Sequence, residues 1–228
     1  QPVAEIAALV KGAGGVLVVD AVQAVGRLPL DISSGTADFL ILSAHKLGGP
    51  KGVGAFVSAS TLLMPVPLVR GGGQEKGHRA GTENVPGIAG FGAAAEAAAK
   101  ALDTMADVRR LRDTAEAALR DLAPDVVIYG AGAERLPNTF LFTIPGLKAE
   151  TALIGLDLAG VSVSTGSACS SGKVGASHVL EAMGSAGAEG ALRVSIGTAT
   201  TTAEIDRFLA SLHGLLARRT TMSVASAA

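Results

Sequence analysis

The sequence of 228 residues contains only one cysteine, one tyrosine and no tryptophan. A single cysteine excludes an intrachain disulfide and any metal site built only from cysteines. No apolar run approaches the ~20 residues that a membrane-spanning helix needs, so we expect no transmembrane segment. The 19 basic and 20 acidic residues give a formal charge of −1. This balance argues against broad electrostatic binding to nucleic acid or to an anionic membrane.

The apolar fraction of 48% is typical of a globular protein. Because domains contain roughly 100–200 residues, this length suits one large domain or one and a half. The chain begins with Gln1 rather than methionine, and residues 1–12 have the pattern of an amphipathic helix rather than of a signal peptide. We therefore expect that a segment upstream was removed or was never included.

Two apolar runs, Val16–Val19 and Ala37–Ser43, are typical of strands buried on both faces. The first run leads into Asp20, and the second leads into Ala44, His45 and Lys46. Because ligands bind at the carboxyl ends of strands in open α/β sheets, polar residues at these ends are candidates for a site.

Strands alternate with helices along the rest of the chain, which predicts an α/β fold. A long alanine-rich helix is expected from Pro86 to about Leu122, with a second, smaller α/β unit after it. We place the boundary at about residue 100, so that residues 1–100 form the end of a large domain and residues 101–228 form a small one. The other expected elements are strands at Ala55–Val57, Val126–Tyr129, Thr139–Ile144 and Ala191–Ile196, and helices at Glu150–Ala159 and Thr202–Arg218, followed by a loose tail.

Lys46 is the first candidate for chemistry, because a lysine held in a polar cleft can form a Schiff base with an aldehyde cofactor. The alternative is an ordinary solvated lysine on a surface loop. Asp20 ends the neighbouring strand, so both side chains could project from one sheet edge. Pyridoxal phosphate requires this pair of groups. The lysine binds its aldehyde carbon, and the carboxylate keeps its pyridine nitrogen protonated, which makes the ring an electron sink.

Competing motifs are weak. Ser43–Lys46 fits the S-x-x-K pattern, but the chain has neither S-D-N nor K-T-G, so the penicillin-binding interpretation fails. Residues 166–173 do not have the spacing of a phosphate-binding P-loop. The four histidines have no ligand spacing, and no metal site is expected.

Two further residues are candidates because of their surroundings. Cys169 lies among serines and glycines in residues 164–172. A free cysteine is usually a small core residue, but a Ser/Gly loop instead favours an exposed, mobile thiol. Arg193 interrupts the apolar segment Leu192–Gly197, and a buried guanidinium needs an anion. That anion could be a structural carboxylate or the carboxylate of a substrate.

Taken together, five segments resemble the cysteine desulfurases of the NifS/IscS type, which belong to the class V aminotransferase group of fold-type I pyridoxal-phosphate enzymes. The resemblance extends from the first residue to about residue 215. It implies an α/β fold in which part of a large, mainly parallel sheet domain is followed by the small domain. The segments, in order, are Val19–Gly26, Ser43–Lys46 with Gly49–Gly54, Gly72–Glu75 with Arg79–Asn84, Thr165–Ser170, and Arg193–Gly197.

The resemblance also implies roles for individual residues. Lys46 would form the Schiff base with pyridoxal phosphate and move the α-proton of the substrate, and Cys169 would take the sulfur of L-cysteine as a persulfide and leave alanine. Arg193 would hold the substrate carboxylate. The remaining implied roles are cofactor contacts: Asp20 to the pyridine nitrogen, Gln23 to the phenolic oxygen, Ser43 and His45 to the phosphate, and Thr82 to the phosphate of the partner protomer.

The implied protein is a cytoplasmic homodimer that passes sulfur to an acceptor such as an iron–sulfur scaffold protein. In the family, further strands and cofactor contacts precede the helix with which this chain begins. An alternative hypothesis is therefore a truncated, non-catalytic remnant or dimerisation module of the same fold. A selenocysteine lyase or another class V lyase is a minor alternative, which the segment Thr165–Ser170 disfavours.

Overall fold

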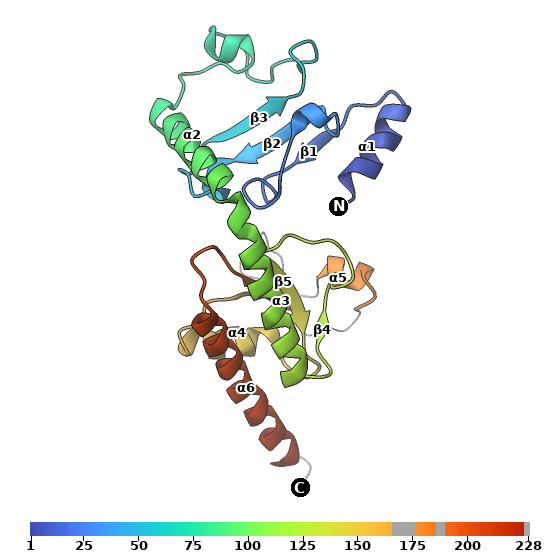
Figure 1. Cartoon of the computed structure of the whole chain (residues 1–228), viewed down its shortest axis with the longest axis vertical. Helices are drawn as coiled ribbons and strands as arrows, with labels where there is room; N and C mark the ends of the chain where they lie inside the picture. The colour runs from blue at the N-terminus through green and yellow to red at the C-terminus, as the bar shows by residue number, and fades with distance from the viewer. Residues whose placement is uncertain (166–176, 186–189, 226–228) are drawn as a thin grey trace. The chain divides into compact units, whose positions relative to one another are not determined.

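The computed structural model describes residues 1–165, 177–185 and 190–225 (Figure 1). The chain divides into two compact units, Gln1–Asp103 and Thr104–Ala228. Each unit has its own sheet and its own hydrophobic core.

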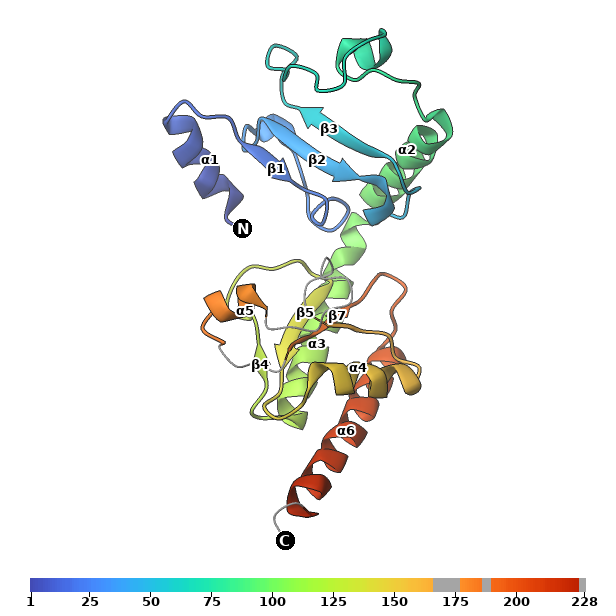
Figure 2. The ribbon, with the colours of Figure 1, turned by 180° about the vertical axis from the view of Figure 1, so that it is seen from behind.

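The first unit is built on a mixed three-stranded sheet with the order β1-β2-β3. β1 and β2 are parallel, whereas β2 and β3 are antiparallel. Figures 1 and 2 show helix α1 beside β1, and helix α2 beside the end of β2. The bounds of these elements are α1 Val3–Gly12, β1 Val18–Asp20, β2 Phe39–Ser43, β3 Gly54–Ser58 and α2 Val85–Lys100.

One face of this sheet carries the core of the first unit. Leu40 on β2 packs with Ala21 and Ala37, and Val19 and Val57 lie against this cluster. Side chains alternate between the two faces of a strand. On the other face Phe39 is 5% exposed and stacks on Phe56, but several of its neighbours are more exposed.

On that other face, Val18 is 48% exposed, Ile41 39% and Phe56 45%. The expectation that the two apolar runs form strands buried on both faces is therefore wrong at Val18 and Ile41, whereas Phe39 and Leu40, on opposite faces of β2, are both buried. The physical reason is that the described residues pack a cluster of side chains against one face, whereas on the other face only Phe39 is buried among the described strand residues.

Helix α2 packs closely on the loop that follows β2, through two of its glycines. A Cβ on Gly87 would lie 2.4 Å from Cγ2 of Val53, and a Cβ on Gly90 would lie 2.6 Å from Cγ of Pro50. The helix is capped at its start by Asn84, whose side-chain oxygen accepts a hydrogen bond from the Gly87 amide at 3.1 Å.

The single long helix expected from Pro86 to Leu122 is wrong. α2 ends at Lys100, a 3-10 turn η4 covers Leu102–Thr104, and α3 spans Met105–Leu122. The interruption falls where the two units divide. It separates a helix that packs on the first unit from a helix that buries Val108, Ala115 and Leu119 in the core of the second.

The second unit contains a four-stranded antiparallel sheet with the order β4-β5-β7-β6. Phe140 and Phe142 of β5 and Leu192 and Val194 of β7 point into its core, and Phe142 makes an edge contact with Phe208. The elements are β4 Val127–Ile128, β5 Thr139–Thr143, α4 Ala149–Leu158, β6 Ser164–Thr165, α5 His178–Ala182, β7 Leu192–Ser195 and α6 Thr202–Ala225.

Helix α6 continues to Ala225, past the expected end at Arg218. No glycine or proline follows Gly214, so nothing in the sequence of this segment stops a helix. Within the described part of the chain, no helix combines the length and the apolar character that crossing a membrane would need.

Candidate active site

The parallel pairing of β1 and β2 places the ends of both strands at one edge of the first sheet. Asp20 is the last residue of β1 and lies opposite Ile41, two residues before the end of β2. The amide of Ala21 extends this ladder by donating to the Ile41 carbonyl at 3.0 Å. Asp20 is exposed, and its Oδ1 accepts a hydrogen bond from the Val22 amide at 3.0 Å. Its carboxylate is therefore fixed at the edge and open to a ligand.

The segment after β2 forms a 3-10 turn, η2 (Ala44–Lys46). Ala44 is fully buried, and its carbonyl accepts the amides of Leu47 and Gly49, both at 2.9 Å. The Ala44 amide donates to the Val53 carbonyl at 3.0 Å. This small buried anchor fixes the backbone on both sides of Lys46.

Three polar residues, Ser43, His45 and Lys46, lie at the end of β2 and in the turn that follows it. Ser43 Oγ is 2.9 Å from His45 Nδ1, so one of these two groups donates a hydrogen bond to the other. Lys46 is half-buried, and its Nζ makes no hydrogen bond or ion pair with any residue that the structure describes. A hydroxyl, an imidazole, an amine and the Asp20 carboxylate thus belong to the two segments that end at the same edge of the sheet.

Gln23 follows in the turn after β1, and its side chain is exposed. The backbone of Gln23 makes a contact: its carbonyl accepts a hydrogen bond from Nη1 of Arg27 at 3.0 Å. Nη2 of the same arginine donates to the Lys46 carbonyl at 3.2 Å. Sequence reasoning missed Arg27, because its partners are backbone atoms that no motif reveals.

Thr82 lies in the loop before α2 and is exposed. Its side chain makes no hydrogen bond with the residues at the sheet edge within the described chain. The backbone just before it is held by Arg79, which donates to the Gly81 carbonyl at 2.6 Å and pairs with Glu75 at 2.9 Å. Glu75 itself has a positive φ of 50°, which is uncommon for a residue other than glycine.

Arg193 lies on β7 in the second unit, opposite Leu141 on one side and Ser164 on the other. Its neighbours Leu192 and Val194 point into the core, so Arg193 lies on the other face of the sheet. Its Nε is buried and without a hydrogen-bond partner, and no described carboxylate pairs with the side chain. Cys169, the second predicted catalytic residue, lies outside the described residues.

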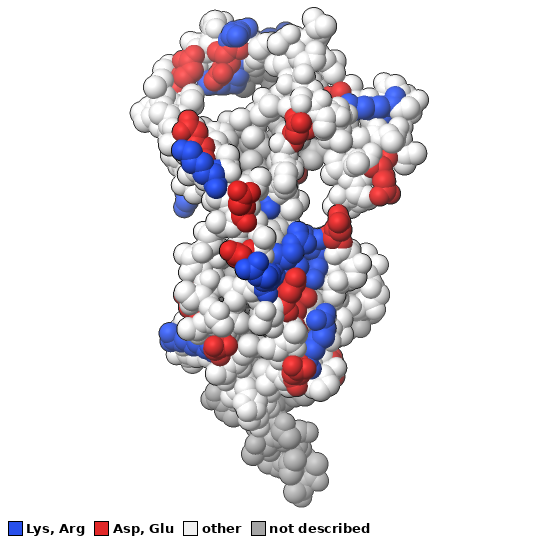
Figure 3. Space-filling view, in the orientation of Figure 1, with Lys and Arg blue, Asp and Glu red and all other residues white. Residues whose placement is uncertain are grey.

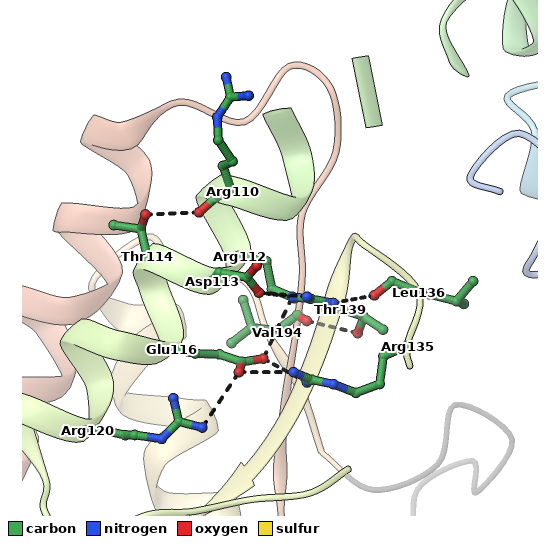
Figure 4. Close-up of polar contacts among 10 residues, drawn as sticks. All are labelled: Arg110, Arg112, Asp113, Thr114, Glu116, Arg120, Arg135, Leu136, Thr139 and Val194. Carbon is green, nitrogen blue, oxygen red and sulfur yellow. Dashed lines mark hydrogen bonds and ion pairs between the residues drawn. The ribbon is translucent and has the colours of Figure 1, made fainter. Parts of the chain in front are cut away.

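Sequence reasoning also missed a charged network in the second unit (Figure 4). Glu116 of α3, whose side chain is 5% exposed, accepts two hydrogen bonds from Arg135 at 2.7 and 3.1 Å. Arg112, also 5% exposed, donates to Asp113 and to the Leu136 carbonyl. These contacts tie the loop before β5 to α3, which is a structural role. The i,i+4 spacing of Arg112, Glu116 and Arg120 on α3 is the sequence signal for it.

Charged side chains are otherwise distributed over both units (Figure 3). Three groups in the first unit, Arg27, Asp31 and Asp38, have lowered pKa values, and the hydrogen bonds from Ser33 are the main cause for Asp31. The hydrogen bond from the Leu17 amide lowers the pKa of Asp38, and the ion pair with Lys11 acts in the same direction. Burial lowers the pKa of Arg27. Among the described residues, no group of three or more His, Cys, Asp or Glu side chains could hold a metal ion.

Comparison with known proteins identifies similar chains. The cysteine desulfurase of Gluconacetobacter diazotrophicus is 43% identical over 226 residues, which cover 97% of this chain and 56% of that protein. The cysteine desulfurase of Cereibacter sphaeroides is 45% identical over 210 residues, which cover 91% of this chain and 54% of that protein. This chain therefore spans little more than half the length of these relatives.

A solved structure and a family model also match this chain. The crystal structure of a NifS-like protein from Rickettsia africae superposes with a TM-score of 0.83 at 35% identity, over 94% of this chain and 57% of that one. The family model for aminotransferase class V matches residues 1–208. This match covers most of the chain, and the chain therefore belongs to the class V aminotransferase family.

Proposed function

We propose that the chain provides the catalytic lysine and the sulfur-accepting cysteine of a pyridoxal-phosphate-dependent cysteine desulfurase. The observation that carries this proposal is the convergence of Asp20, Ser43, His45 and Lys46 at one sheet edge, with Lys46 Nζ unpaired among the described residues. The names of the two relatives support the choice of L-cysteine as substrate.

The residues at this edge fit the cofactor. Asp20 supplies a carboxylate for the pyridine nitrogen, and Lys46 supplies an amine for covalent attachment. Ser43 and His45 offer donors to the phosphate, and Gln23 offers one to the phenolic oxygen. When bound, pyridoxal phosphate acts as an electron sink, which makes the Cα–H bond of the substrate acidic.

The residues of this chain would then carry out the remaining steps. Lys46 Nζ moves the α-proton of L-cysteine. The buried, unpartnered Nε of Arg193 belongs to a guanidinium that is available to a substrate carboxylate. Cys169 Sγ attacks the substrate sulfur, so that the C–S bond breaks and an S–S bond forms. The electron pair of the C–S bond would stay on Cβ, which takes the proton released by the thiol, and the α-proton would return to Cα. The product is then alanine, and the enzyme keeps a persulfide.

We also propose the assembly and the partners that the resemblance implies. Thr82, in an exposed loop, would reach the phosphate bound by a second copy of the protein in a homodimer. The persulfide would pass to an acceptor such as an iron–sulfur scaffold protein in the cytoplasm. Residues 1–100 would be the end of the cofactor-binding domain, and residues 101–228 would be the small domain.

The experiment measures alanine formed from L-cysteine by the purified chain supplied with pyridoxal phosphate. We expect Lys46→Ala and Cys169→Ser to abolish alanine formation, whereas the control Lys51→Ala, which changes an exposed lysine of the same loop, retains it. Unchanged turnover in Cys169→Ser would refute the persulfide role. A wild-type chain that forms no alanine would refute activity for this chain and favour the non-catalytic alternative.

A further inference from the structure

We propose that Arg27 is a positioning residue, which fixes the backbone of Lys46 against the turn that carries Gln23. The proposal goes beyond the cofactor contacts described above, and it rests on the proposed function for the role of Lys46. Its basis is a pair of hydrogen bonds through which the Arg27 side chain bridges two segments of the chain. A sequence motif does not reveal this bridge, because both acceptors are backbone carbonyls.

The bridge is made by the two terminal nitrogens of one guanidinium. Nη1 donates to the Gln23 carbonyl at 3.0 Å, and Nη2 donates to the Lys46 carbonyl at 3.2 Å. The second contact spans 19 positions in the sequence, so it joins the turn after β1 to the 3-10 turn after β2. A planar guanidinium suits this task, because its fork presents several N–H donors in a fixed geometry.

Arg27 has no carboxylate partner among the described residues. The guanidinium is half-buried, and burial lowers its pKa. Removing a cation from water costs free energy that an ion pair usually offsets. Here the described partners are two backbone carbonyls, so the contact fixes backbone positions rather than balancing charge.

The packing around Gly26 points to the same bridge. Gly26 has a φ of +73°, and a Cβ at this position would lie 2.8 Å from Cδ2 of Leu47 and 3.1 Å from Cβ of Ala98 on α2. The turn that carries Arg27 therefore approaches the residue that directly follows Lys46. Positive φ and the close approach both require glycine here, and together they bring Arg27 within reach of the Lys46 carbonyl.

Amide hydrogen exchange tests this bridge without any need for cofactor. The amides of Leu47 and Gly49, which donate to Ala44, report on the backbone around Lys46. The Ala59 amide, which donates to the Asp38 carbonyl at 2.9 Å, reports on the far end of the sheet. The matched control is Arg70→Met, because Arg70 is an exposed arginine of the same unit whose Nε donates to one carbonyl, that of Pro67, at 3.5 Å.

In Arg27→Met we expect exchange at Leu47 and Gly49 to accelerate about five-fold, the effect of losing a hydrogen bond of typical strength. Exchange at Ala59 should not change. Arg27→Lys keeps the charge but reaches only one carbonyl, so it should give an intermediate rate, and Arg70→Met should match the wild type. Equal acceleration at all three amides would show that Arg27 stabilises the whole sheet rather than the backbone at Lys46, and it would overturn the proposal. An absence of acceleration at all three amides would overturn it as well.

Covalent trapping provides a second readout and separates this proposal from the proposed function. The full chain is incubated with pyridoxal phosphate and reduced with borohydride, and the labelled lysines are mapped by mass spectrometry. We expect Arg27→Met to lower labelling at Lys46 several-fold relative to Lys51, with Arg70→Met unchanged. If the wild type is labelled at Lys46 and Arg27→Met is labelled equally, the role of Arg27 is refuted. If the wild type is not labelled at Lys46, the proposed function fails, and the exchange rates alone decide whether Arg27 fixes this backbone.

Discussion

Lys46 differs from the other lysines of the first unit in the way its surroundings are held. Lys11 forms an ion pair with Asp38 and donates to the Gly35 carbonyl, and Lys51 is exposed. Lys46 instead is half-buried, with a fixed backbone and an Nζ without a described partner, whereas Lys76 and Lys100 are exposed like Lys51. This combination suits the role proposed for Lys46, because a lysine engaged in an ion pair must first break it.

Asp38 gives the clearest pH-dependent prediction at the scale of single residues. Its pKa is lowered in the folded state, mainly by the hydrogen bond from the Leu17 amide. The ionised carboxylate therefore stabilises the fold above its ordinary pKa of 3.8, and this contribution is lost as the pH falls through the lower folded value. We expect Asp38→Asn to be less stable than the wild type near neutral pH.

The difference between Asp38→Asn and the wild type should shrink at about pH 3, below the ordinary pKa of an aspartate. Denaturant unfolding at the two pH values measures this difference. The control is Glu96→Gln, which changes an exposed carboxylate on α2. A gap between Asp38→Asn and the wild type that stays constant with pH would contradict the assignment of the stabilisation to the ionised carboxylate.

At the scale of the elements, helix α2 holds the loop after Lys46 in place through glycines rather than through large side chains. The spacing of Gly87 and Gly90 puts backbone against Val53 and Pro50. Helix α2 is rich in alanine and glycine, and Gly87 is its one buried residue. It can nevertheless hold the loop after Lys46, because its glycines allow this close approach. A larger residue at either glycine would push the helix away from that loop.

Two glycines of α2 provide a matched pair of variants. Gly90→Ala would bring its Cβ to 2.6 Å from Cγ of Pro50, whereas a Cβ at Gly92 has nothing within 4 Å. We expect Gly92→Ala to stabilise the chain by up to about 1 kcal/mol, since alanine favours a helix over glycine. Gly90→Ala should instead destabilise it by about 1–3 kcal/mol through overpacking. Denaturant unfolding measures both, and equal stabilisation by the two variants would contradict the close packing of α2 on this loop.

The site could be predicted from the sequence where a side chain follows a strand. Asp20 and Lys46 end consecutive apolar runs, and parallel strands bring such ends together. Arg27 could not be predicted, because its partners are backbone carbonyl groups, which every residue has. The division into α2 and α3 was also missed, since no glycine or proline lies between residues 93 and 122 to mark a break.

At the scale of the whole molecule, the chain consists of two units with separate cores. The first holds Asp20 and Lys46, and the second holds Arg193. The first sheet leaves Val18, Ile41 and Phe56 partly exposed on one face, and the chain spans about 56% of the cysteine desulfurase of Gluconacetobacter diazotrophicus. The central question is therefore whether the residues of this chain are sufficient to direct the cofactor to Lys46.

Site-resolved trapping answers that question most directly. The purified chain is incubated with pyridoxal phosphate and reduced with borohydride, and every lysine is scored by mass spectrometry. We expect the adduct at Lys46, loss of that adduct in Lys46→Ala, and weaker labelling in Asp20→Ala, with the exposed Lys51 and Lys76 little modified in each case. Equal labelling of Lys46, Lys51 and Lys76, or an unchanged total in Lys46→Ala, would contradict the assignment of Lys46 as the cofactor lysine.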